Sequence, residues 1–437
     1  MIGKTSVVIL VALAAGCAVE SPYDRPYVAE GIEERTGHGL GPAAKPGEFS
    51  LPAGVSLEDG LSDDEAVALA LWNNARFQAD LATLGFARAD LIEANMLPNP
   101  VFSLLFPVGP KLLEMKLNAP IEALWQRPHR VAAAKRDAQS AAENLIAHGL
   151  GLIRDVQTTY TDLWLAQEQA RLAREEAQLR VEIDNLAQSR LRAGDISELA
   201  ASAAHVDSLR AGDAVVRFSK EALVLRQRLS ALLGFGSDNT AFQLTLQDTA
   251  PQTAVSVDEM LEMACAARPD LRAAELKIEA AGQRIGWEKS KVYNFIATID
   301  GKDKGEDHLT IGPGFQVEIP ILNQNNGRIA RAKAELEQAA RQYEAVRQSI
   351  MLQVREAHTQ YVSAHEEFGL WHDEITPSME TAGEQAQRSY EAGDASYLLV
   401  LEVRQKLFEA RLRQTELAAQ LRRCAAQLNY CVGSKMI

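Results

Sequence analysis

The chain has 437 residues, of which 47% are hydrophobic but only 6% aromatic, and its formal net charge is −14. This length allows two or three domains or one long architecture, and the excess of acidic side chains argues against nucleic acid as a partner. The abundance of Ala, Leu, Glu, Gln and Arg favours long helices that pack closely through small side chains.

The first 17 residues predict a signal peptide. One lysine is followed by an apolar run that is too short to span a bilayer, and then by small residues before Cys17. This ending resembles the bacterial lipobox, whose cysteine becomes the diacylglycerol- and palmitate-bearing first residue, although Ala14 stands where Leu is usual. Ala18 in place of Asp favours the outer membrane as the destination. The alternative is an ordinary cleaved signal with an incidental cysteine.

Three further cysteines, Cys265, Cys424 and Cys431, leave an odd thiol in an oxidising compartment. Cys424 and Cys431 are seven positions apart, roughly 10 Å along a helix, which is too far for a disulfide. Two interpretations stay open: Cys265 pairs with one of the other two, or all three are buried free thiols.

The rest of the chain divides into a leader and two similar halves. Residues 18–60 are rich in Pro, Gly and charge and predict an extended leader. The halves, 61–233 and 257–433, are joined by an equatorial linker at 234–256, and their similarity indicates internal duplication. The helices are expected at 62–95, 128–193, 196–233, 257–293, 328–392 and from the second turn to about 432. Pro377 should kink the second long helix.

Two segments, 111–121 and 309–321, alternate strictly between apolar and polar residues, and the segments 100–107 and 294–302 are expected to pair with them as two hairpins. Leu113, Met115 and Leu117 share one face, for example, while Glu114 and Lys116 share the other. The period of two predicts strands that are long enough to cross a membrane when tilted. Four strands cannot close a barrel alone, because open edges in lipid leave backbone groups unpaired, so insertion requires an oligomer. The alternative is two soluble hairpins that pack on the helices.

Each half contains the turn sequence Ala-Gly-Asp, at an offset of 199 positions. Gly194 and Gly393 are expected to end their helices in the left-handed conformation that glycine adopts most easily. Asp195 is then expected to cap the next helix, with Glu198 completing a capping box. Two serines also fit this first turn: Ser197 and Ser396.

A third copy of the string, LRAGD at 209–213, has a different expected role. Its counterpart in the second half lies in uninterrupted helix, so Gly212 is predicted to be internal to a helix. There a glycine costs about 1 kcal/mol relative to alanine.

The duplicated halves, the lipobox, RLRAG at 190–194 and AGDASYLLVLE at 392–402 resemble the TolC-type outer-membrane efflux proteins over roughly residues 50–433. The resemblance implies a mainly α fold in which duplicated hairpins of long helices form an α-barrel. It also implies a homotrimer in which each chain gives four transmembrane strands to a twelve-stranded β-barrel. The implied partners are outer-membrane lipid, a periplasmic adaptor (membrane fusion protein) and an inner-membrane pump, with the chain as the passive exit duct of a tripartite export system.

The same resemblance assigns roles to particular residues. The residues that match the adaptor-docking tip are Arg190, Gly194, Asp195, Ser197, Gly393, Asp394 and Ser396. Ser389 stands at the counterpart of Arg190, so a symmetric contact is not expected. Leu399 and Glu402 match positions that narrow the tunnel, where threefold symmetry would place an apolar ring beside a carboxylate ring. Leu399 is equally a normal core residue of a helix pair.

The sequence contains no nucleophile–base motif, zinc-ligand spacing or phosphate-binding glycine loop, so no enzyme activity, resident metal or cofactor is expected. His358, His365 and His372 recur every seven residues, a spacing that favours a solvated stripe over a metal site. The alternative function is a lipid-anchored periplasmic coiled coil or adaptor without a pore. The cargo, whether drug, metal ion or polypeptide, is not encoded in any motif.

Overall fold

The structure, a computed structural model, describes residues 21–42, 45, 47–57, 59–106, 113–236, 242–245, 256–303 and 309–436. Cys17 and the hairpin loops at 107–112 and 304–308 lie outside these ranges. The leader contains α2 (Arg25–Thr36). The first half contains α3 (Asp63–Asn73), α4 (Ala75–Ala82), α5 (Leu84–Asn95), β1 (Val101–Leu105), β2 (Leu113–Pro120), α6 (Ala123–Arg192) and α7 (Glu198–Leu232). The second contains α8 (Val257–Ala267), α9 (Pro269–Ser290), β3 (Phe295–Asp303), β4 (Leu309–Val317), α10 (Asn326–Leu370), the π-helical turn η1 (Trp371–Ile375), α11 (Thr376–Glu391) and α12 (Tyr397–Val432).

The order of elements repeats between the halves, and the repeat is in register at the turns. Helix α6 ends at Arg192 and α11 ends at Glu391, while α7 begins at Glu198 and α12 begins at Tyr397. Both pairs differ by the 199 positions that separate the two Ala-Gly-Asp strings. The mainly helical fold class with a small antiparallel sheet is therefore confirmed.

Two expected helices are interrupted. The segment 62–95 breaks at Asn74 and again at Thr83. The side chain of Asn74 accepts a hydrogen bond from the N–H of Phe77 (2.9 Å) and donates one to the carbonyl of Leu232 (2.9 Å). A short polar side chain can compete in this way for helical backbone groups. The segment 257–293 breaks at Arg268, which precedes the first residue of α9, Pro269.

The second long helix does not bend at Pro377 in the simple way that the sequence predicts. A single π-helical turn precedes α11, in which the N–H of Thr376 donates to the carbonyl of Trp371, five residues back. Pro377 then occupies the first turn of α11, where its missing N–H costs little. The departure from α-helical hydrogen bonding is thus confined to the single π turn η1, which is the usual form in which π-helix occurs inside α-helices.

The leader is not extended throughout, which corrects the prediction for 18–60. Residues 25–36 form α2, whose Tyr27 hydroxyl donates to a Glu143 carboxylate oxygen at 2.6 Å. Farther along, Arg35 donates to the carbonyl of Ala267 at 3.2 Å. These contacts tie the helix to elements distant in sequence, which a composition argument cannot detect.

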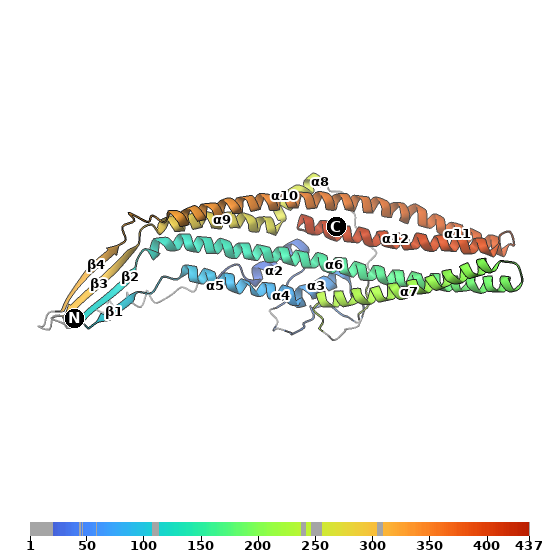
Figure 1. Ribbon diagram of the computed structural model, residues 1–437, viewed down its shortest axis with the longest axis horizontal. Helices are drawn as coiled ribbons and strands as arrows, with labels where there is room; N and C mark the ends of the chain where they lie inside the picture. The colour runs from blue at the N-terminus through green and yellow to red at the C-terminus, as the bar shows by residue number, and fades with distance from the viewer. Residues whose placement is uncertain are drawn as a thin grey trace. The chain divides into compact units, whose positions relative to one another are not determined.

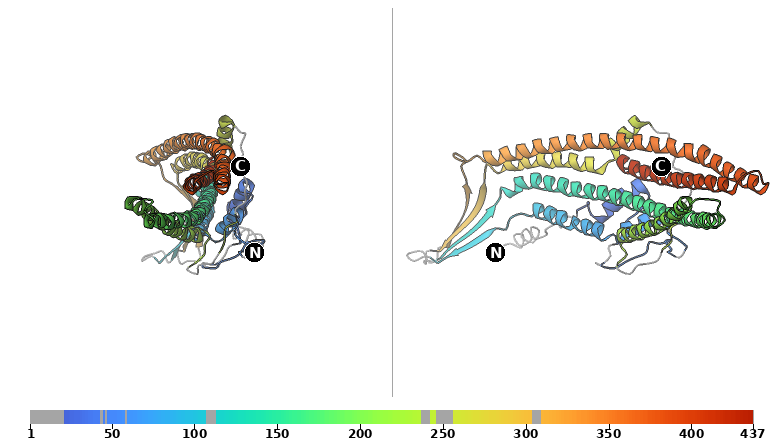
Figure 2. Two further views of the ribbon diagram at one scale, coloured as in Figure 1. Left: turned by 90° about the vertical axis from the view of Figure 1, so that its right-hand side faces the viewer. Right: turned by 45° about the vertical axis from the view of Figure 1, so that its right-hand side comes forward.

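The chain forms two compact units, through both of which α6 and α10 pass. Unit 1 comprises 1–29, 80–147 and 269–348, and contains the antiparallel sheet in the order β1-β2-β3-β4. The strands form one twisted ribbon (Figure 2). All four predicted strands are present, and their bounds differ from the expected ones by at most four residues at the described ends.

Small side chains allow the helices of unit 1 to approach closely. Ala138 and Ala142 of α6 and Ala273 of α9 are each at most 2% exposed, and the hydroxyl of Ser140 donates to the carbonyl of Ala273 at 2.9 Å. A Cβ added to Gly286 would lie within 3 Å of the His129 ring. The alanine-rich composition therefore serves close helix packing, as expected from the sequence.

Unit 2 comprises 30–79, 148–268 and 349–437. In it α7 returns along α6, and α12 returns along α11 (Figure 1). Tyr160 of α6 is buried and its hydroxyl donates to the carbonyl oxygens of Leu61 (2.8 Å) and Thr245 (2.9 Å). Leu61 also pairs with Leu244 in a single parallel bridge.

Within the described residues, no helix is both long and apolar enough to cross a membrane.

Candidate functional site

Two exposed turns, at the ends of the paired helices of unit 2, are the principal candidate site. Gly194 (φ +82°) and Gly393 (φ +83°) both adopt the left-handed conformation that the sequence predicts. In the first turn the N–H of Asp195 donates to the carbonyl of Arg190 at 2.9 Å, and in the second the N–H of Asp394 donates to that of Ser389 at 2.8 Å. The two turns thus repeat the same helix-ending bond, 199 positions apart.

The capping residue differs from the prediction. Ser197 is the N-cap of α7 and its hydroxyl accepts from the N–H of Ala200 at 3.3 Å; Ser396 caps α12 in the same way through Leu399 at 3.3 Å. Asp195 is not the cap, and Glu198 is the first helical residue, so the predicted capping box is absent. The backbone N–H of Asp195 closes the preceding helix, which leaves the cap to a later residue.

The side chains at the turns are free to meet a partner. All seven predicted tip residues are exposed: Arg190, Gly194, Asp195, Ser197, Gly393, Asp394 and Ser396. No atom outside the immediate neighbours lies within 4 Å of a Cβ built on either turn glycine. The two tips differ chemically, because only the second carries an aromatic pair, Tyr390 and Tyr397, whose ring centroids are 5.3 Å apart.

Leu399 and Glu402 lie on the first turns of α12, directly after the second tip. Leu399 is 45% exposed, and Glu402 is also exposed, whereas Val400 and Leu401 are buried. Within one chain Leu399 is therefore not a core residue of the helix pair, which removes the packing explanation that the sequence left open.

One polar pair near the first tip could not be predicted from motifs. The Nδ1 atom of His205 on α7 lies 2.9 Å from a carboxylate oxygen of Asp184 on α6. The hydrogen bond from His205 lowers the pKa of Asp184. The two residues stand ten positions before and eleven after Gly194, and this near-symmetry about the turn is the signal that could have placed them opposite each other.

The third Ala-Gly-Asp string is not a turn. Gly212 lies inside α7 and is exposed, as predicted for a helix-internal glycine. Nothing lies within 4 Å of a Cβ built on it. Gly212 therefore provides an internal comparison for the turn glycines.

The cysteines and histidines singled out in the sequence have ordinary surroundings. Cys265, Cys424 and Cys431 are all free thiols, so Cys265 is not paired with either of the others. Cys265 is exposed, Cys424 is half-buried and only Cys431 is buried, so the expectation of three buried thiols holds for Cys431 alone. Burial raises the pKa of the Cys431 thiol. His372 lies 2.9 Å from the side-chain nitrogen of Gln414. Among the described residues no group of three His, Cys, Asp or Glu side chains could hold a metal ion.

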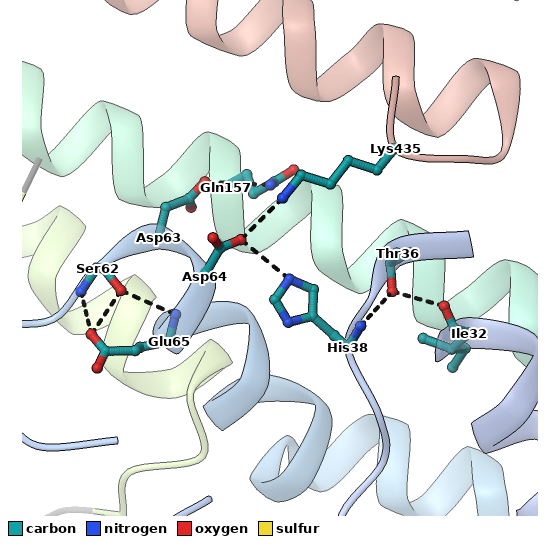
Figure 3. Close-up of polar contacts among 9 residues, drawn as sticks. All are labelled: Ile32, Thr36, His38, Ser62, Asp63, Asp64, Glu65, Gln157 and Lys435. Atoms are coloured by element: carbon teal, nitrogen blue, oxygen red, sulfur yellow. Dashed lines mark hydrogen bonds and ion pairs between the residues drawn. The ribbon is translucent and has the colours of Figure 1, made fainter. Parts of the chain in front are cut away.

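A second polar cluster, at the start of α3 in unit 2, joins three distant segments (Figure 3). One carboxylate oxygen of Asp64 lies 3.3 Å from His38 Nε2 in the leader and 3.5 Å from Lys435 Nζ after α12. These contacts lower the pKa of Asp64 to about 2, with the His38 hydrogen bond as the largest cause. Asp63 is half-buried, with one carboxylate oxygen shielded from solvent, and this desolvation, together with the charge of Asp64, raises its pKa to about 6. The cluster is therefore a structural link between the leader, α3 and the segment after α12.

The duplicated helical hairpins, the amphipathic four-strand ribbon and the two exposed turns define a channel protein of the cell envelope rather than a soluble coiled coil. Residues 113–235 and 260–434 match the family described as "Outer membrane efflux protein". Because this match covers more than half of the chain, the chain belongs to the outer membrane efflux protein family. It is an outer-membrane efflux channel, and the pore-free alternative is not favoured.

Similar proteins agree with this assignment. The cobalt-zinc-cadmium resistance protein CzcC of Cupriavidus metallidurans is 24% identical over 378 residues, which cover 85% of this chain and 90% of CzcC. The structure of CusC matches with a TM-score of 0.68 at 19% identity, over 89% of this chain and 96% of that one. The outer membrane protein VceC of Vibrio cholerae matches with a TM-score of 0.69 at 17% identity, over 85% and 96%. The structural matches show that the fold is shared.

Proposed function

We propose that this protein is the passive outer-membrane exit duct of a tripartite export system, and that it conducts divalent heavy-metal cations. It works as a homotrimer, in which each chain contributes β1–β4 to a twelve-stranded barrel and its long helices to a periplasmic tunnel. A periplasmic adaptor docks on the two exposed turns, and an inner-membrane pump supplies the energy, so the chain itself performs no chemistry.

The observation that carries this proposal is the two-faced sheet of unit 1. On one face of the ribbon, large apolar side chains stand exposed: Phe102 (61%), Ile311 (66%) and Phe315 (76%). Such a face is suited to lipid, and the two outer strands leave open edges that only further strands can satisfy. Three copies of the ribbon placed edge to edge satisfy both requirements.

The turns support adaptor docking because they combine rigid, hydrogen-bonded backbones with exposed side chains. Beyond the second turn, the exposed Leu399 and Glu402 would form the constriction that the adaptor opens. Glu402 would attract cations at this point, since a ring of carboxylates favours positive charge.

The proposed cargo is supported by the name of a similar protein and by the charge of the chain. CzcC is described as a cobalt-zinc-cadmium resistance protein, and the net charge of −14 makes cations compatible with this chain. Cys17 is proposed to carry the lipid that holds the N-terminus at the outer membrane, which adds an anchor independent of the strands.

The test is metal accumulation in cells that lack this protein. Loss should raise cellular Co²⁺, Zn²⁺ or Cd²⁺ during exposure, and the wild-type chain should restore export. Unchanged levels of all three ions would contradict the proposed cargo. A matched strain that carries a Cys17→Ala variant tests lipid attachment independently of the cargo. The wild-type protein should incorporate radiolabelled palmitate, and the variant should not.

A further inference from the structure

The polar face of the sheet carries four charged side chains in an alternating pattern. On β2 they are Glu114 and Lys116, and on β3 they are Asp300 and Lys302. Strand pairing sets Glu114 opposite Lys302, and Lys116 opposite Asp300. Because side chains separated by two positions on a strand share a face, all four lie on the face opposite Leu113 and Met115.

Each lysine also contacts the carboxylate on its own strand. Lys116 Nζ lies 3.1 Å from Glu114 Oε1, and Lys302 Nζ lies 2.8 Å from Asp300 Oδ2. Each lysine therefore has one carboxylate along its strand and one across from it, and the charges sum to zero. The pattern continues with an uncharged pair, in which the Thr298 hydroxyl donates to Asn118 Oδ1 at 3.0 Å.

We propose that these four residues form a charge-balanced ring that sets the ion selectivity of the outer end of the channel. This inference rests on the proposed function, since it requires the polar face of the ribbon to line the pore. Three chains would place six carboxylates and six ammonium groups on the pore wall at the same height. The opposite face, which exposes Phe102 and Ile311, is unsuited to water.

The balance of charge at the sheet should affect how readily divalent cations leave the duct. A wall of carboxylates alone would bind such ions strongly and delay their exit, whereas conduction requires that ions also leave readily. Lys116 and Lys302 cancel this attraction at the sheet while Glu402, near the tip, retains it. The proposed duct thus attracts cations at Glu402 and does not retain them at the sheet.

Opposite neutralisations provide the test, because they leave the backbone pairing in place. The Lys116→Gln/Lys302→Gln and Glu114→Gln/Asp300→Asn variants would be compared in planar lipid bilayers by reversal potential in a KCl gradient. All proteins would carry Leu399→Ala and Glu402→Gln, so that the tip does not dominate the resistance. We expect the lysine variant to raise the K⁺/Cl⁻ permeability ratio and the acidic variant to lower it, each by about twofold or more at 0.1 M salt and by less at 1 M, where screening is stronger.

Two controls make the result decisive. The exchange Glu114→Lys/Lys116→Glu/Asp300→Lys/Lys302→Asp keeps both the net charge and the opposite charges across the strands, and it should leave the ratio close to that of the parent. Lys289→Gln removes an exposed lysine at the end of α9, outside the sheet, and should also have little effect. Conducting channels whose ratio is the same in the lysine and acidic variants would overturn the charge-balanced ring alone. An absence of conductance in the parent would overturn the proposed pore as well.

Discussion

The glycine at each turn is required by backbone geometry rather than by lack of space. Gly194 and Gly393 have φ near +80°, and nothing occupies the position of a Cβ. A β-branched residue there would adopt a conformation that costs roughly 1–3 kcal/mol or would change the turn. The shape of the tip, and not its packing, is therefore sensitive to substitution.

We predict that Gly194→Val or Gly393→Val abolishes metal export while trimers persist, because only the docking turn is reshaped. Gly212→Val is the matched control, since Gly212 is exposed in the middle of a helix where valine is tolerated. Metal tolerance of cells and trimer yield on unboiled gels would be measured together. Normal export by both turn variants would show that the turns do not dock the adaptor.

The stability of the fold should depend on pH through the carboxyl group of Asp63. The pKa of Asp63 is raised to about 6, so this carboxyl destabilises the fold progressively as pH rises from about 4 through 6. Asp63→Asn should remove this penalty and stabilise the protein at pH 8 by up to about 2–3 kcal/mol, with little gain at pH 4. Asn can still accept the hydrogen bond that Gln157 donates at 3.3 Å.

Asp64, in the same cluster, should affect the stability of the fold in the opposite direction. Its pKa is lowered to about 2, so its contribution is present above pH 4 and is lost as pH falls through 2. Asp64→Asn should therefore lower the melting temperature at pH 8, where Asp63→Asn raises it. Melting followed by circular dichroism distinguishes the two, and shifts of equal sign at pH 8 would contradict the described surroundings.

The turn before α7 shows how much the sequence could predict about the end of a single helix. Glycine, aspartate and serine within four positions identified a helix–turn–helix, because only a few residue types suit its special conformations. The choice of Ser197 over Asp195 as the cap depended on which N–H closes the preceding helix. That choice is fixed by three-dimensional geometry, which the sequence pattern does not contain.

Among the secondary-structure elements, the long helices of the two halves differ. The first half has the single helix α6, whereas in the second half the π turn η1 separates α10 from α11, shortly before Pro377. Pro377 has no N–H to donate to a carbonyl, and the π turn η1 accommodates the missing helical hydrogen bond. We predict that Pro377→Ala stabilises this path by less than about 3 kcal/mol, since part of the cost of proline is already relieved.

Pro269→Ala is the matched control, because Pro269 opens α9, where proline is favourable, and it should give no stabilisation. Thermal melting of both variants tests the idea. A destabilising Pro377→Ala would mean that η1 is held by its own contacts rather than imposed by the proline.

Periodicity predicted the strands and the long helices well, because both depend on repeating patterns within the chain. The break at Asn74 was missed because it depends on a distant partner, whereas the break at Arg268 could have been predicted from Pro269, which disfavours a helical conformation of the preceding residue. Asn74 bonds the carbonyl of Leu232, and buried Arg268 donates to the carbonyl of Tyr430 at 3.0 Å. Such bonds join residues more than 150 positions apart, and no local window includes both.

At the scale of the whole molecule, the requirement for an oligomer comes from unsatisfied surfaces. The sheet has two open edges, and α7 exposes apolar residues at heptad spacing: Leu209, Val216 and Leu223. Both features are costly for an isolated chain in water or lipid. Neighbouring copies that cover them would complete the channel proposed above.

The subunit number and heat stability of the mature protein, extracted in detergent, test this central claim most directly. We predict a complex of three chains by light scattering, which migrates as a trimer on unboiled denaturing gels and as a monomer only after boiling. A stable monomer in detergent, with β1 and β4 left unpaired, would contradict the account.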